Sequence, residues 1–344
     1  MSEALPPPRP VLPVEYAPAG HRGRFPLFRA KHVPLLATLV VCSLLYTVAA
    51  IRYPYFASPG VFVNFFRENG PLGIAAIGLT FVILSGGIDL SVGSVMACTG
   101  ILIATLTQKG MNPWLAMPLA LALGAVFGFV MGCLIHFFQL APFLVTLAGL
   151  FLARGVASVI SLESIGLSHP TFVELSEVAL PITGTISVPL AALVFLGVSL
   201  VAAFVALFTP FGRNVYALGG DEHSAVLMGL PVGRTKIAIY TLSGFCSALA
   251  GVVNSVSIGS GNATAAVGLE LDAIAAVVIG GTLLTGGVGS IWGTVLGVLI
   301  LAIIQTALIF EGTLSSWWTR IVVGALLLVF CLLQRVLEKR GGST

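Results

Sequence analysis

Residues 187–209 read SVPLAALVFLGVSLVAAFVALFT, a run without a single charged side chain. About 20 apolar residues in a helix suffice to cross the hydrocarbon core of a bilayer. Of the 344 residues in the chain, 57% are hydrophobic and 8% are charged, whereas a soluble domain carries about 25% charged residues. The sequence therefore predicts an all-α polytopic membrane protein, and it excludes a soluble enzyme, a disordered chain and a secreted disulfide scaffold.

Similar apolar runs recur along the chain and predict about ten transmembrane helices. Gly and polar residues interrupt the second, third and eighth of these runs. An even number of crossings places both termini on the same side of the membrane. The runs are 33–51, 66–86, 91–108, 113–137, 142–161, 187–209, 235–258, 270–284, 289–310 and 317–337.

The few charges predict which side is the cytoplasm. With both termini inside, the segment 162–185, which holds three glutamates and no Lys or Arg, lies outside. This arrangement obeys the positive-inside rule. The basic residues placed inside are Arg22, Arg24, Arg29, Lys31, Arg213, Arg234, Lys236, Lys339 and Arg340.

The same reading divides the chain into three parts. We expect residues 1–32, which include the Pro-rich stretch PPPRP at 6–10, to form a disordered cytoplasmic tail. Residues 33–337 form the transmembrane domain, and its first helix is long enough to remain as an anchor instead of being cleaved. Residues 338–344 form a second cytoplasmic tail.

The predicted cytoplasmic loop Gly219–Pro231, GGDEHSAVLMGLP, has the pattern of a complete short helix. Gly220 or Asp221 can cap its start, and acidic residues suit the first turn. Gly229 suits the left-handed position that ends a helix. Because isolated helices shorter than about 12 residues are unstable in water, this one must pack on something. A soluble partner is the favoured surface, and the membrane interface is the alternative.

An acidic residue lies between two of the predicted spans, in the sequence SGGIDLSVGS at 85–94. A carboxylate near bilayer depth is costly unless it faces a cavity or a partner, and Gly-rich irregular backbone there must be buried in protein or line water. Asp89 could cap the following helix or contact a transported substrate. Further polar residues in or near spans are candidates for a translocation path. The candidate path residues are Asp89, Ser91, Ser94, Asn254 and Gln305.

Two acids, Glu270 and Asp272, open an apolar run at what we expect to be its outer end. They could stabilise the helix dipole or dock an external protein. The stretch that follows, GGTLLTGG at 280–287, faintly echoes GGIDLSVG at 86–93, and transporters often contain internal repeats.

Several kinds of chemistry have no basis in the sequence. None of the four lysines lies in a phosphate-binding G-x-x-x-x-G-K-[ST] loop. The five scattered cysteines have no C-x-x-C spacing, which argues against a metal site and a disulfide framework. No nucleophile–base arrangement and no chain of intramembrane acids and histidines is present. We therefore expect neither an enzyme nor a nucleic-acid-binding protein, and the missing relay argues against ion coupling.

Three motifs in order carry a resemblance to a known family. The run FVILSGGIDLSVGS at 81–94 resembles the signature of permease subunits of ribose/xylose-type ABC sugar importers. The likeness continues through Gly219–Gly229 and from Glu270 to Gly287, and covers about residues 35–337. Within that family, ESIGLSHP at 163–170 and GTLSSWWT at 312–319 resemble the galactofuranose-importer subgroup. One departure is the sequence at 221–224, DEHS, where many relatives have Asn-Glu-Ala-Ala.

The resemblance implies a bacterial inner-membrane permease subunit for a monosaccharide, galactofuranose or a similar pentose or hexose. It implies three protein partners: a cytoplasmic ABC ATPase that carries ATP and Mg, a second permease subunit, different or identical, and a periplasmic sugar-binding protein. Membrane lipid surrounds the chain, and the chain itself holds no cofactor. The loop becomes the coupling helix that contacts the ATPase, comprising Gly219, Gly220, Asp221, Glu222, His223, Ser224, Ala225, Met228 and Gly229.

Two alternatives remain open. The related branched-chain amino-acid ABC permeases share the general plan. An ion-coupled secondary carrier would act without an ATPase, and would need an ionisable relay within the membrane.

Overall fold

The computed structural model describes residues 33–183, 186–312 and 317–341, so the predicted tail at 1–32 lies outside the described residues. The described chain is helical, with four short strands. Its helices are α1 (Val33–Arg52), α2 (Pro59–Leu84), α3 (Val92–Gln108), α4 (Pro113–Phe137), α5 (Pro142–Ile160), α6 (Pro170–Glu177), α7 (Leu190–Phe208), α8 (Pro210–Gly220), α9 (Glu222–Leu227), α10 (Val232–Ile258), α11 (Leu269–Ile279), α12 (Ile291–Glu311) and α13 (Trp317–Gly341). The strands are β1 (Ile165–Gly166), β2 (Ala179–Thr183), β3 (Ile186–Pro189) and β4 (Ser260–Gly261).

The core of the bundle is built on α2 and α10. Every residue of α2 from Asn69 to Leu84 is buried. Helix α10 packs along α2, α3 and α4, and Gly124, Gly128 and Gly132 of α4 lie against its backbone. Small residues at every fourth position let two helices approach closely, as is common in membrane bundles.

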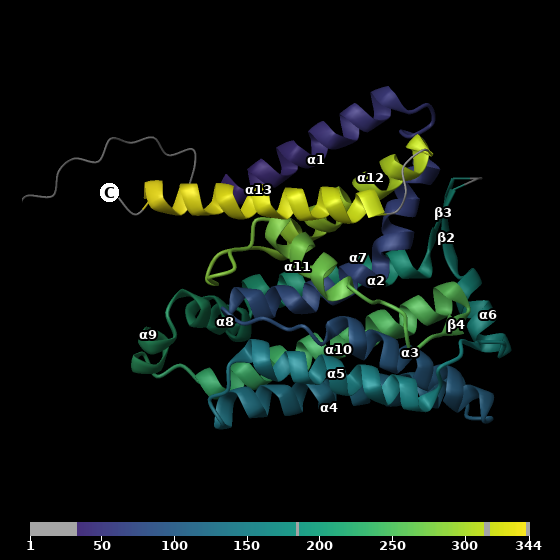
Figure 1. The fold of residues 1–344 in the computed structure, drawn as a ribbon, viewed down its shortest axis with the longest axis horizontal. Coiled ribbons are helices and arrows are strands. Elements are labelled where there is room, and N and C mark those ends of the chain that lie inside the picture. Colours follow the sequence, from purple (N-terminus) through teal and green to yellow (C-terminus); the bar gives the residue numbers. More distant parts are fainter. Residues whose placement is uncertain (1–32, 184–185, 313–316, 342–344) are drawn as a thin grey trace, which may run out of the picture.

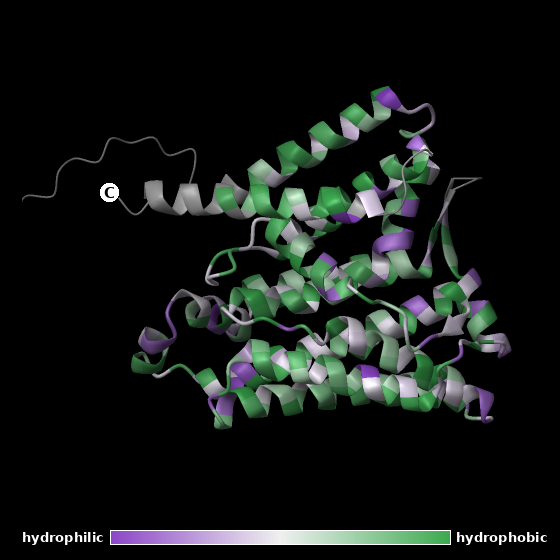
Figure 2. Cartoon of the chain, viewed as in Figure 1, coloured by the Kyte–Doolittle hydropathy of each residue, from purple (hydrophilic) through white to green (hydrophobic). Residues whose placement is uncertain are grey.

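The surface fits a bilayer environment. Among the described residues, six helices are long and apolar enough to cross a membrane: α1, α4, α5, α7, α10 and α12. Large apolar side chains such as Val159, Val201 and Phe204 are exposed on the outside of the bundle. Hydrophilic residues gather toward the two ends of the elongated molecule, with a mostly hydrophobic stretch between them (Figure 2). The chain is therefore a multi-pass helical membrane protein.

The structure refines the predicted runs. Nine of them coincide with α1, α2, α3, α4, α5, α7, α10, α12 and α13 to within a few residues, except at the start of α2 and the end of α13. The run 270–284 is helical only to Ile279, because Gly280 and Gly281 end α11. Eleven residues rise about 16 Å, roughly half of the hydrocarbon core. The prediction of a single spanning helix at 270–284 is therefore wrong, and the total of ten stays a prediction.

The segment that we predicted to be an outer loop contains short strands and one short helix. Residues 162–189 contain β1, the eight-residue helix α6 and the β2–β3 hairpin. Strand β1 pairs antiparallel with β4, which directly follows α10. These elements lie together at one end of the molecule (Figure 1).

The opposite end carries α9. The start of α1 and the end of α13 lie at that same end (Figure 1). Helix α13 continues to Gly341, past the predicted boundary at 337, so the predicted tail at 338–344 is helical over its first four residues. Residues 342–344 lie outside the described chain.

Candidate functional site

The short helix α9 presents almost all of its surface to solvent. Ala225 is buried, whereas Val226, Leu227 and Met228 are 55%, 74% and 67% exposed. The acidic residues Asp221 and Glu222 at its start are exposed as well. A two-turn helix with exposed apolar residues is not stable by itself in water, so this surface is suited to contact with another molecule.

Local contacts hold α9 in place despite its exposure. Asp221 Oδ1 accepts a hydrogen bond of 2.6 Å from the Ser224 N–H, as predicted for a helix cap. The hydrogen bonds from Ser224 hold the pKa of Asp221 below its ordinary value. Lys236 Nζ donates to Glu222 Oε1 at 2.6 Å and ties α9 to α10. Gly229 ends the helix with a φ of +75°, as its sequence pattern predicted.

Of the two predicted caps, Gly220 and Asp221, the structure shows Asp221. Gly219 and Gly220 belong to the last turn of α8, a helix that the sequence reading missed. Thr209 caps α8 and Pro210 occupies its first turn. This Thr-Pro start was visible in the sequence as a helix signal.

Three backbone segments meet beside the end of α8, and we call this the glycine junction: the end of α2 at 84–86, Gly219–Gly220 of α8, and Gly286–Gly287. The Gly287 N–H donates to the Leu84 carbonyl at 2.9 Å. A methyl group at Gly219 would overlap the Leu84 carbonyl oxygen, and one at Gly286 would lie within about 3 Å of Gly219 backbone atoms. The two glycine-rich segments with similar sequences, 86–93 and 280–287, thus approach each other at the C-terminal end of α8.

The segment 85–91 is non-helical and runs from the glycine junction into the bundle, where α3 begins (Figure 1). Asp89 lies on it and is 3% exposed. Its Oδ1 accepts from the Ser91 N–H at 2.9 Å and the Ser91 hydroxyl at 2.7 Å, and its Oδ2 accepts from the Ser243 hydroxyl on α10 at 2.7 Å. The carboxylate is therefore satisfied inside the protein. The predicted cap is wrong, because Ser91 is the N-cap of α3 and makes no side-chain cap hydrogen bond, and substrate contact by Asp89 stays a prediction.

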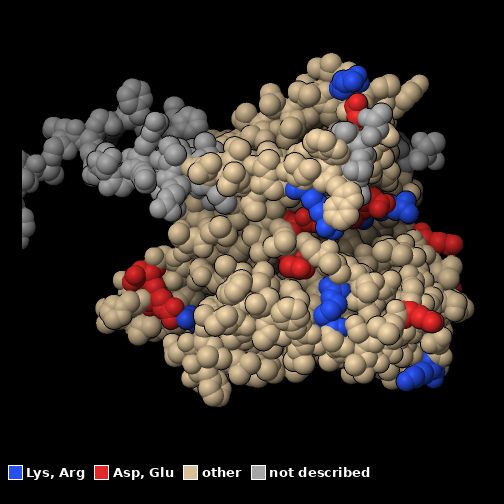
Figure 3. All heavy atoms as spheres, viewed as in Figure 1, with Lys and Arg blue, Asp and Glu red and all other residues tan. Residues whose placement is uncertain are grey.

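A second group of charges lies where α11 begins. Helix α11 starts near the middle of the molecule in the view of Figure 1, and both Glu270 and Asp272 are half-buried. Glu270 interacts electrostatically with Arg154 of α5, and Asp272 with Arg320 of α13. Glu270 Oε2 is buried without a hydrogen-bond partner. Acidic and basic side chains are seen together near the middle of the face drawn in Figure 3, apart from the charges at its two ends.

Glu270 and Asp272 lie in the first turn of α11, as expected for acids that open a helix. That turn lies near the middle of the view in Figure 1 and not at the end that carries α6 and the hairpin. A role along a path through the protein suits half-buried acids better than a role in docking, which stays a prediction. Arg154 Nη1 also donates to the carbonyls of Ala263 and Ala265, both at 2.7 Å. The sequence reading missed Arg154, although a single cation in the apolar run 142–161 was a signal for it.

The candidate path residues fall into separate places. Ser94 joins the Asp89 cluster by donating to the Ser91 carbonyl at 2.8 Å. Asn254 lies about three turns beyond Ser243 on α10, and Gln305 lies on α12; both are half-buried. In the described part of the chain, neither shares a hydrogen bond with the Asp89 cluster.

Comparisons with known proteins agree with the membrane architecture. The family model described as "branched-chain amino acid transport system / permease component" matches residues 61–331. The chain is 49% identical over 306 residues to the inner membrane ABC transporter permease protein YjfF of Escherichia coli strain K12, which covers 89% of this chain and 92% of that protein.

Two further relatives are named as import permeases for sugars. The fructose import permease protein FruG of Bifidobacterium longum is 39% identical over 317 residues, covering 90% of this chain and 93% of that one. The ribose import permease protein RbsC of Bacillus subtilis is 38% identical over 304 residues, covering 85% and 90%. No solved structure matches the chain.

Proposed function

Because the chain belongs to the family of branched-chain amino acid transport system permease components, and its relatives include import permeases for fructose and ribose, we propose that it moves a monosaccharide inward across the membrane. The cargo we propose is galactofuranose or a similar pentose or hexose. The chain is a permease subunit of an ABC transporter and not an enzyme.

The observation that carries the proposal is the exposed, locally fixed helix α9. Its apolar residues Leu227 and Met228 are presented to solvent, while the Asp221 cap and the Lys236–Glu222 ion pair hold its position. We propose that α9 is the coupling helix and inserts into a cleft of a cytoplasmic ABC ATPase. ATP and Mg belong to that partner, and no cofactor belongs to this chain.

The glycine junction supplies a mechanical connection from α9 to the interior. Helix α8 leads directly into α9, and its last turn contacts both the end of α2 and Gly286–Gly287 without intervening side chains. A displacement of α9 would therefore be passed to α2 and, through the loop before α12, to α11. Closely packed interfaces move between discrete arrangements more readily than they deform.

The path that we propose passes the charged group at the start of α11. Glu270, with its unpartnered oxygen, and Arg154 offer the acceptors and donors that sugar hydroxyls need. Asn254 and Gln305 remain candidate residues for other positions along the translocation path. We propose ten passages through the membrane, with α3 and α11 entered through non-helical segments, and with both termini in the cytoplasm.

Three protein partners follow from this function. The ATPase contacts α9, a second permease subunit of different or identical sequence completes the path, and a periplasmic sugar-binding protein delivers the cargo to the end that carries α6 and the hairpin. The name of the matching family keeps branched-chain amino acids as an alternative cargo. An ion-coupled carrier has less support, because the relatives are ABC permeases.

Co-purification tests this proposal. A tagged full-length chain is expected to retain an ABC ATPase in mild detergent, and the binding protein captured with it is expected to contain a monosaccharide that mass spectrometry identifies. Retention of a branched-chain amino acid would contradict the proposed cargo. Purification without any ATPase, under conditions that preserve the ATPase complex of a known ABC importer, would contradict the proposed coupling.

A further inference from the structure

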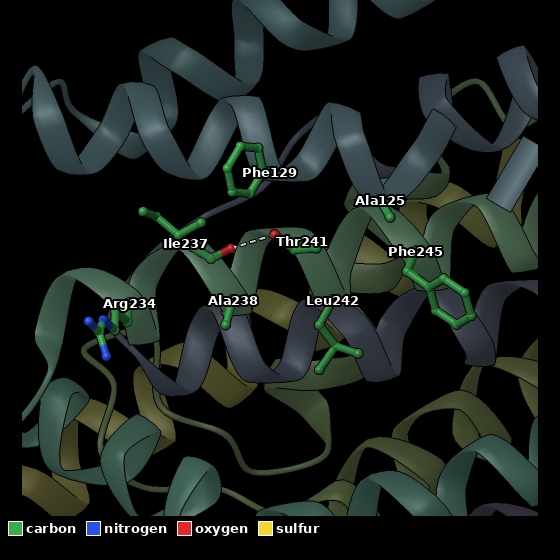
Figure 4. A pocket seen from close by; sticks show the side chains of 8 residues that line it. All are labelled: Ala125, Phe129, Arg234, Ile237, Ala238, Thr241, Leu242 and Phe245. Atoms are coloured by element: carbon green, nitrogen blue, oxygen red, sulfur yellow. Dashed lines mark hydrogen bonds between the residues drawn. The ribbon is translucent and has the colours of Figure 1, made fainter. Parts of the chain in front are cut away.

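Helix α10 is buried on most sides but leaves one stripe open. Exposed or half-buried residues follow one another at helical spacing from Arg234 through Ala238 and Leu242 to Phe245. Together with Ala125 and Phe129 of α4 they line a groove of about 620 Å³ (Figure 4). Apart from Arg234 and Thr241, its walls are apolar.

A second apolar hollow of about 270 Å³ lies beside the first. Leu242 and Phe245 line both, and the second is closed on its other side by α7 at Gly197 and Val201. A Cβ atom added at Gly197 would meet no atom within 4 Å. The two hollows share Leu242 and Phe245, and we call them together the α10 groove.

The length of the α10 groove fits one leaflet of a bilayer. Eleven residues separate Arg234 from Phe245, a rise of about 16 Å. One leaflet contributes about half of a hydrocarbon core roughly 30 Å thick. Arg234 lies close to α9 in the chain, at the end that we place in the cytoplasm, so the groove extends from the cytoplasmic surface toward the middle of the membrane.

The polar groups of the groove are distributed unevenly. The Thr241 hydroxyl is already occupied, since it donates to the Ile237 carbonyl at 2.8 Å (Figure 4). The ion pairs of the described residues are Arg52–Glu311, Arg67–Glu68 and Lys236–Glu222, and none of them includes Arg234. One unpaired cation therefore stands at the end of an apolar channel.

We propose that the α10 groove binds an anionic phospholipid of the cytoplasmic leaflet. Arg234 contacts the headgroup phosphate, and an acyl chain lies along Ala238, Leu242 and Phe245 toward Gly197. Basic pockets between membrane helices on the cytoplasmic side are suited to acidic headgroups. A lipid held there contacts α4, α7 and α10 together and thereby braces the helix that follows α9.

Lipid binding to the purified full-length chain tests the proposal. Native mass spectrometry would compare dioleoyl phosphatidylglycerol with dioleoyl phosphatidylcholine, which share the same acyl chains. One Arg near a membrane surface contributes enough to favour the anionic lipid about fivefold. We expect Arg234→Gln to remove this preference and leave the weaker binding common to both lipids.

Two matched controls separate the headgroup and the acyl chain. Arg213 of α8 is also exposed near α9 but lines neither hollow, so Arg213→Gln is expected to retain the preference. Gly197→Leu fills the second hollow and is expected to weaken binding of both lipids. Gly155→Leu places the same side chain in equally open surroundings on α5 and is expected to leave binding unchanged.

Three results would overturn the proposal: equal affinity of the wild type for the two lipids, an unchanged preference in Arg234→Gln, or unchanged affinity in Gly197→Leu. Repeating the measurement with the co-purifying subunits tests whether a partner subunit, and not a lipid, occupies the groove in the assembly. If the preference is present in the isolated chain and absent in the assembly, a partner subunit covers the groove and the lipid assignment is wrong.

Discussion

At the scale of single residues, Gly219 has the most demanding position near α9. Its backbone lies so close to the Leu84 carbonyl and the Gly287 N–H that no side chain fits between them. The next residue, Gly220, has open space in the position of a side chain. Alanine substitutions at these two neighbouring glycines therefore form a matched pair, one in a tightly packed position and one in an open position.

We expect Gly219→Ala to impair transport and stability, and Gly220→Ala to be tolerated. Overpacking typically costs about 1–3 kcal/mol, and backbone atoms cannot rotate away as a flexible side chain would. The midpoint of thermal unfolding in detergent and the rate of uptake in vesicles measure the two effects. Equal behaviour of the two variants would show that the glycine junction is not tightly packed.

The Asp89 cluster makes a second prediction at this scale. Ser243→Ala removes a donor to Asp89 Oδ2 and leaves a buried carboxylate oxygen unsatisfied, which costs about 1–3 kcal/mol. Ser247, one turn away and equally buried, donates only to the Ser243 carbonyl of its own helix. We expect Ser247→Ala to lower the free energy of unfolding less, and equal losses would contradict the role assigned to Ser243.

Sequence reasoning succeeded for residues whose role is local. The Asp221 cap and the left-handed Gly229 depend on neighbours within a few positions, so the sequence predicted both. The partners Ser243 and Asp89 are 154 positions apart, and no local pattern connects them. Arg154 and Glu270 likewise meet only when α5 and α11 are placed in space.

At the scale of elements, α9 is the unit on which the proposed coupling depends. Glu222 is its first residue, where Pro is tolerated, so the helix must be broken further along. Ser224 supplies the N–H that Asp221 accepts, and Pro at this position removes it.

We expect Ser224→Pro to weaken association with the ATPase at least tenfold, because the cap is worth about 1 kcal/mol and the helix backbone is also distorted. Ser224→Ala keeps the N–H and is expected to bind normally. Pull-down of the ATPase from detergent, with equal amounts of each variant, measures the difference. Normal binding by Ser224→Pro would mean that α9 is not the docking element.

The elements that were predicted correctly have strong hydrophobic runs, such as α4, whose bounds Pro113–Phe137 match the predicted run. The failures concern elements set by tertiary contacts. Helix α11 stops at Gly280, which packs against the Gly293 backbone of α12, and the Thr38 hydroxyl of α1 donates to the Ile279 carbonyl at its end. Strands β1 and β4 pair across a long stretch of chain, so neither was recognisable locally.

At the scale of the whole molecule, the charges that are so sparse in the sequence collect in a few places. Besides the two ends, Arg154, Glu270, Asp272 and Arg320 form a group between α5, α11 and α13, in which Arg320 is exposed and the other three are half-buried. A path lined by acidic and basic residues in balance is compatible with a neutral sugar. A path for a charged cargo would carry an excess of residues of the opposite charge.

The orientation of the molecule is testable by labelling. In a chain with its five native cysteines replaced, His223→Cys on α9 and Ser168→Cys before α6 introduce exposed thiols at opposite ends. We expect a membrane-impermeant maleimide to label Ser168→Cys in intact spheroplasts and His223→Cys only after lysis. Labelling of both in intact spheroplasts would contradict the proposed topology.

The central claim is that a partner ATPase drives this permease through α9. The most direct test is uptake of a radiolabelled monosaccharide by vesicles containing the chain, with and without the co-purified ATPase, second permease subunit and binding protein. The account predicts accumulation against a gradient only for the complete assembly with ATP, and its loss in the Ser224→Pro assembly. Sustained accumulation by this chain alone, or undiminished uptake by the Ser224→Pro assembly, would contradict it.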